Sequence, residues 1–151
     1  MSVTTEGRKA APRTLTPGMT ATIGFAAYAT AVAAGELLGL NRDTDPAALE
    51  AEHLVMALIA LVGAVLAVWA ARRAWNGPPH RLARTSLALA VAAAATFLAF
   101  WAGWTTVFGA VAVGTALEHR RRVGSLSGSS GTALALGSLA FVAGTVTCLV
   151  G

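Results

Sequence analysis

Long blocks of apolar residues, separated by short polar segments, run along most of the chain. A helix needs about 20 mainly apolar residues to cross the ~30 Å hydrocarbon core of a bilayer. The blocks predict an all-α integral membrane protein, a bundle of five transmembrane helices. The predicted spans lie near residues 17–40, 52–73, 82–102, 103–118 and 132–150. Residues 1–16 form a polar tail, and residues 17–151 form one helical domain.

Local capping signals predict where several of these helices begin and end. Thr16–Pro17 and Asp45–Pro46 each combine an N-cap side chain with proline at the first helical position. Gly77–Pro79 should end the second helix, because glycine suits the C-terminal cap and proline cannot continue a helix.

The run between Arg84 and Glu118 carries no charge and is too long for one span. As a single helix it would measure ~50 Å, and it would need a tilt beyond the roughly 40° upper limit usually seen. Trp101–Trp104 offers a natural turn, since glycine permits a reversal and tryptophan favours the membrane interface. We therefore expect a helical hairpin that turns at Ala102–Gly103 beneath two outer tryptophans.

The basic residues predict the orientation. With a cytoplasmic N-terminus and an external C-terminus, five spans place every basic residue except Arg42 inside. A four-span alternative would put Arg120–Arg122 outside and break the positive-inside rule. A cleaved signal peptide ending near Ala27–Ala29 is a competing interpretation, but apolar sequence continues well past that point, which favours a retained anchor.

Composition supports the membrane class. The chain is 56% hydrophobic and 12% charged, about half the charged fraction of soluble domains. Its net charge of +4 comes from short clusters beside apolar spans, a pattern that excludes nucleic acid as an expected partner. Abundant alanine and a large excess of arginine over lysine suggest a bacterial plasma membrane protein.

Small residues recur at one-face helical spacing and predict close helix packing in the lipid bilayer. The strongest positions are Gly35 with Gly39 in the first span, and Gly137 with Gly144 in the last. Whether such contacts form within one chain, in a homo-oligomer or with another membrane protein stays open at this stage.

Candidate chemistry gathers on the outer side, where Glu36, Glu50 and His53 could bind a proton or cation. Glu50 and His53 form one E-x-x-H pair, whereas a diiron bundle needs two such pairs and two further glutamates. A calcium-loop pattern over residues 41–52 has Pro46 where that loop requires glycine. We therefore expect no metal, no other cofactor and no catalytic residue.

Three functions fit the pattern. The favoured one is a small accessory or structural subunit without its own catalysis, because the spans carry few polar groups. The first alternative is an oligomeric channel or transporter for a cation or small solute, using Glu36 and the outer acidic loop. The second is a membrane enzyme that uses Glu36, Glu50 and His53.

Overall fold

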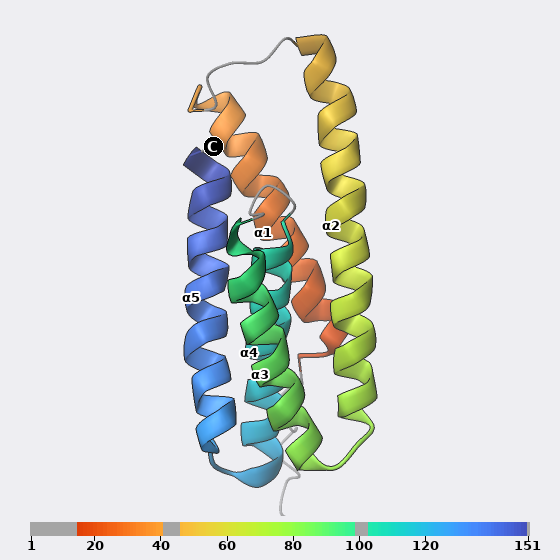
Figure 1. Cartoon of the computed structure of the whole chain (residues 1–151), viewed down its shortest axis with the longest axis vertical. Helices are drawn as coiled ribbons and strands as arrows, with labels where there is room; N and C mark the ends of the chain where they lie inside the picture. Colours follow the sequence, from red (N-terminus) through yellow and green to blue (C-terminus); the bar gives the residue numbers. More distant parts are fainter. Residues whose placement is uncertain (1–14, 41–45, 99–102, 151) are drawn as a thin grey trace, which may run out of the picture.

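The computed structural model describes residues 15–40, 46–98 and 103–150, with the side chains of the second helix described from Leu54 onward. These residues form five α-helices that run alternately up and down the long axis (Figure 1). The helices are α1 (Pro17–Leu37), α2 (Pro46–Trp75), α3 (Pro79–Ala95), α4 (Trp104–Val123) and α5 (Gly128–Val150). The predicted all-α architecture is confirmed for this part of the chain.

Three segments are long and apolar enough to cross a membrane: Leu54–Trp75, Pro79–Leu98 and Gly128–Val150. They belong to α2, α3 with the short 3-10 turn that follows it, and α5. Large apolar side chains of these segments face outward, as expected where lipid rather than water surrounds the protein. The structure therefore supports a membrane protein.

Local signals place several helix ends correctly. Thr16 is the N-cap of α1, and its Oγ1 accepts a hydrogen bond from the Met19 N–H at 3.3 Å. Pro46 is the first residue of α2, while Asp45 lies outside the described residues. α2 ends at Trp75 and α3 begins at Pro79, so the chain reverses where Gly77–Pro79 predicted.

α1 ends earlier than expected because Gly39 closes it. The Leu40 N–H bonds to the Gly35 carbonyl, and the Gly39 N–H bonds to the Glu36 carbonyl. With Gly39 at φ +64°, these two bonds form a Schellman cap. Gly35 is buried within α1, whereas Gly39 lies beyond the helix with no atom within 4 Å of a Cβ built on it. The predicted packing pair Gly35–Gly39 therefore does not lie on one helix.

The expected hairpin joins α3 to α4. Gly103 has φ +70° and immediately precedes Trp104, the first residue of α4. A Cβ built on Gly103 would lie 2.8 Å from the Tyr28 ring of α1, so both the backbone angle and the space require glycine. Ala102 and Trp101 lie outside the described residues, but the break occurs at the predicted glycine.

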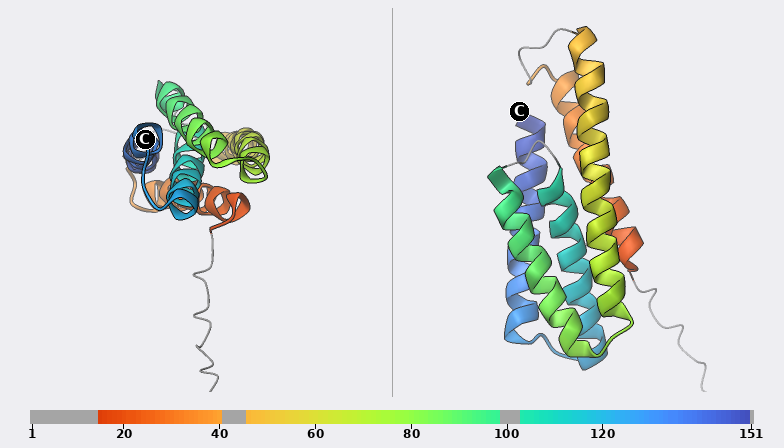
Figure 2. Two further views of the ribbon diagram at one scale, coloured as in Figure 1. Left: turned by 90° about the horizontal axis from the view of Figure 1, so that it is seen from below. Right: turned by 45° about the vertical axis from the view of Figure 1, so that its right-hand side comes forward.

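α4 occupies the centre of the bundle, with the other four helices around it (Figure 2, left). Almost every residue from Thr105 to Ala116 is buried, and Val107, Val111 and Thr115 have no exposed surface. α2 is the opposite case. Its alanines pack inward, and its larger apolar side chains from Leu54 to Trp69 are mostly exposed on the outside.

Small residues make the tightest contacts between helices. A Cβ built on Gly109 of α4 would lie 2.7 Å from the Gly137 carbonyl oxygen of α5. One built on Gly24 of α1 would lie 2.8 Å from the Val107 Cα, and one on Gly144 would lie 2.8 Å from Thr106 Oγ1. The structure thus places Gly137 and Gly144 at helix contacts within one chain.

Trp104 packs into the bundle instead of facing outward as an interface residue. Its Nε1–H donates a hydrogen bond of 2.7 Å to the Ile59 carbonyl of α2. A Cβ built on Gly63 would lie 2.6 Å from the indole, so this glycine makes the space for the ring. This hydrogen bond therefore holds the start of α4 against the middle of α2.

Candidate functional site at the arginine end

Every arginine that the structure describes lies at one end of the bundle, the lower end in Figure 1. At this arginine end α2 and α4 finish, while α1, α3 and α5 begin. The residues are Arg72, Arg73, Arg81, Arg84, Arg120, Arg121 and Arg122. Three different helices thus bring their positive charges to the same surface.

Glu118 neutralises two of these arginines. Its side chain is 3% exposed and receives hydrogen bonds of 2.7 Å from Arg121 Nε and Nη2 and from Arg122 Nε. Glu118 follows the apolar part of α4, so these ion pairs lie at the charged end of the central helix.

His119 is buried beside Glu118, and its Nδ1 has no hydrogen-bond partner among the described residues. The described residues contain no group of three or more histidine, cysteine, aspartate or glutamate side chains that could hold a metal ion. Glu118 is already committed to two guanidiniums. This end therefore has the chemistry of an anion site more than of a metal site.

A basic groove of about 380 Å³ lies between α2 and α3 at this end. Arg73 lies over the ring of Trp69, with its guanidinium carbon 5.5 Å from the ring centroid. No carboxylate in the described part of the chain forms an ion pair with Arg73, Arg81 or Arg84. The basic groove is lined by Trp69, Ala70, Arg73, Ala74, Arg81, Arg84 and Thr85.

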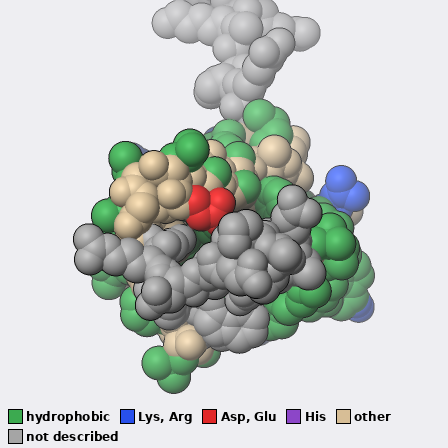
Figure 3. Space-filling model, turned by 90° about the horizontal axis from the view of Figure 1, so that it is seen from above, with side chains coloured by type: hydrophobic (Ala, Val, Ile, Leu, Met, Phe, Trp, Pro, Cys, Tyr) green, Lys and Arg blue, Asp and Glu red, His purple; other side chains and the backbone are tan. Residues whose placement is uncertain are grey.

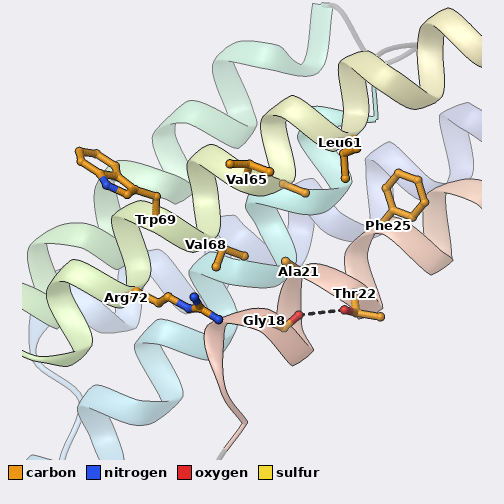
Figure 4. A pocket seen from close by; sticks show the side chains of 10 residues that line it. Gly18, Ala21, Thr22, Phe25, Leu61, Val65, Val68, Trp69 and Arg72 are labelled. Carbon is orange, nitrogen blue, oxygen red and sulfur yellow. Dashed lines mark hydrogen bonds between the residues drawn. The ribbon is translucent and has the colours of Figure 1, made fainter.

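A second groove, of about 610 Å³, lies between α1 and α2. Figure 4 shows its mainly apolar lining, from Phe25 and Leu61 at one end to Arg72 near the start of α1 at the other. Trp69 borders both grooves. The two neighbouring arginines of α2 therefore serve different grooves, Arg72 the apolar one and Arg73 the basic one.

The predicted proton or cation site falls at the opposite end. Glu36 lies in the last turn of α1 and is exposed, and a small acidic patch is visible at that end in Figure 3. Glu50 and His53 belong to the first part of α2, where side chains lie outside the described part of the structure. Their pairing with Glu36 stays a prediction.

The basic groove was missed because its arginines were interpreted only as signs of orientation. Arg73 and Arg84 belong to different helices, and the tight turn at Gly77–Pro79 brings them to one groove. A local signal did exist for Glu118, since arginines three and four positions later share its helix face.

No protein-family profile matches the chain, and no curated protein or solved structure shows significant similarity to it.

Proposed function

We propose that all five helices span a bacterial plasma membrane, with the N-terminus in the cytoplasm and the C-terminus outside. The gathering of the described arginines at one end supports this orientation, because cytoplasmic flanks are rich in arginine and lysine. A C-terminal reporter that is active only in the cytoplasm should be silent. A bright signal from it would contradict the five-span arrangement.

Within that membrane, the chain acts as an accessory subunit of a larger membrane protein assembly and has no catalysis of its own. The observation that carries this proposal is the position of α4, which fills the axis of the bundle. Between Thr105 and Ala116 its buried side chains are apolar or hydroxyl-bearing, and Thr115 Oγ1 donates to the Val111 carbonyl at 2.7 Å. In the described part of the chain, such an axis offers no polar path through a single copy and no convergent reactive groups.

The outer face of α2 is the surface we assign to the partner, another membrane protein. Small residues on the inner face of α2 already pack against the bundle, while Leu58 and Val62 are both 54% exposed on the outer face. Leu139 and Val142 provide an equally exposed face on α5 for comparison. Without a partner, both faces would contact lipid. Substitutions on the α2 face should therefore displace the partner, and substitutions on the α5 face should not.

Purification from native membranes in lipid nanodiscs tests the proposal. We expect one foreign protein at fixed stoichiometry, lost in the Leu58→Trp/Val62→Trp variant and retained in the Leu139→Trp/Val142→Trp variant. A homo-oligomer that conducts cations after reconstitution, with the flux abolished by Glu36→Gln, would instead establish the conduit. Equal loss of the foreign protein in both tryptophan variants would refute the assignment of its binding surface to α2.

A further inference from the structure

We infer that the basic groove between α2 and α3 binds the phosphate of an anionic phospholipid. Three arginines from two helices line this groove, Arg73 from α2 and Arg81 and Arg84 from α3. The contrast with Arg121 and Arg122 is direct, because those two already share the Glu118 carboxylate. The inference rests on the geometry of the groove and stands independently of the proposed accessory role.

An anion is the ligand that this arrangement lacks. Like charges brought into one groove repel each other unless a counter-charge lies between them. Guanidinium groups present several N–H donors in a planar fork that matches phosphate oxygens. The ring of Trp69 lies beneath the Arg73 guanidinium, which restricts its position before any ligand arrives.

The surroundings of the groove indicate a lipid and not a soluble phosphate. Trp69 is 61% exposed, and Leu66 and Val65, which are 50% and 60% exposed, continue the same face of α2 toward the middle of the bundle. A phosphate held by Arg73 would thus have exposed apolar surface directly beside it, where acyl chains can lie. Basic pockets between transmembrane helices recognise anionic headgroups by this combination.

The net charge of the lipid should decide its affinity. Phosphatidylglycerol carries one uncompensated negative charge, whereas phosphatidylcholine brings a choline cation that would add to the positive charge of the groove. We therefore expect phosphatidylglycerol to bind in preference to phosphatidylcholine of the same chain length.

The test compares two variants that lose the same charge. Arg73→Gln/Arg84→Gln removes two guanidiniums from the basic groove, and Arg72→Gln/Arg120→Gln removes two from the same end outside it. Detergent-purified full-length protein is titrated with short-chain phosphatidylglycerol or phosphatidylcholine, and bound lipid is counted by native mass spectrometry. We expect about 30-fold weaker phosphatidylglycerol binding in the first variant, equivalent to ~2 kcal/mol, and a change below about twofold in the second.

Three further results decide the inference. Arg73→Lys/Arg84→Lys keeps the charge but removes the planar fork, so it should bind phosphatidylglycerol more tightly than the glutamine variant and less tightly than the unsubstituted protein. Binding as weak as in the glutamine variant would overturn the role of charge in this groove. Equal weakening by the two glutamine variants would reduce the effect to net charge and overturn the site. Complete displacement of the lipid by glycerol phosphate at equal concentration would show a soluble-phosphate site and would overturn the lipid assignment.

Discussion

Gly109→Ala tests whether backbone contact between α4 and α5 stabilises the bundle. A Cβ built at this position would lie 2.7 Å from the Gly137 carbonyl oxygen, 2.9 Å from the Phe141 nitrogen and 3.1 Å from the Phe141 Cα. All three atoms belong to the backbone of α5. A change of side-chain rotamer therefore cannot relieve the overlap, and the two helices must separate.

The magnitude follows from two opposing effects. Replacing glycine by alanine inside a helix favours the helix by roughly 1 kcal/mol. Overpacking usually costs about 1–3 kcal/mol, and a rigid backbone neighbour places this site at the upper end of that range. We expect Gly109→Ala to lower the free energy of unfolding by about 2 kcal/mol, or about 30-fold in the folding equilibrium.

Gly131→Ala is the matched control in α5, because no atom lies within 4 Å of a Cβ built there. It keeps the helix-propensity gain without the overlap, so it should be as stable as the unsubstituted protein or slightly more stable. The assay is unfolding in mixed micelles with increasing dodecyl sulfate, followed by circular dichroism and tryptophan fluorescence.

Two results would refute the reasoning about α4 and α5. One is a Gly109→Ala protein as stable as Gly131→Ala, because the close approach would then be absent. The other is restored stability when Phe141→Ala is added to Gly109→Ala. Phe141→Ala removes only the side chain, whereas the contacted atoms of Phe141 are backbone atoms that it leaves in place.

Four other substitutions test further features by the same unfolding assay. Gly114→Ala should destabilise by about 1–2 kcal/mol, and Thr20→Ala should restore much of this, because a Cβ on Gly114 would meet the Thr20 side chain; failure of the rescue would contradict that contact. Trp104→Phe should lose about 1 kcal/mol with its 2.7 Å hydrogen bond to α2, and unchanged stability would show that the bond contributes nothing. Glu118→Gln should lower the free energy of unfolding, because it leaves the Arg121 and Arg122 guanidiniums without the carboxylate that they share. Unchanged stability of the Glu118→Gln variant would show that these ion pairs contribute nothing.

Sequence reasoning was accurate where the determinants are local. The N-cap at Thr16 and the proline turn before α3 depend on residues adjacent in sequence, and the structure has both. The break at Gly103 was also predictable, because length excluded one helix and glycine marked the turn. Gly39 shows the limit of this reasoning, since the same glycine spacing fits a packing stripe or a helix cap.

Features that depend on two helices were beyond the sequence. Trp104 turns inward because Gly63, on another helix, leaves room for its ring beside the Ile59 carbonyl. The basic groove combines Arg73 of α2 with Arg84 of α3, on the two sides of the turn between these helices. The hydrophobic pattern of the sequence predicts neither contact, because it describes each helix alone.

The positions of α2 and α4 explain why hydropathy and burial disagree in this protein. α2 contains a highly apolar candidate span and exposes its large side chains, whereas α4 is absent from the candidate spans but is enclosed by its neighbours. Lipid removes the usual reason to bury large apolar side chains, so much of the interior consists of glycine, alanine and threonine, which let backbones approach. The Gly109→Ala substitution tests this explanation. It makes α4 more apolar, and it should still destabilise the protein, because contact between backbones and not hydrophobicity holds the central helix in place.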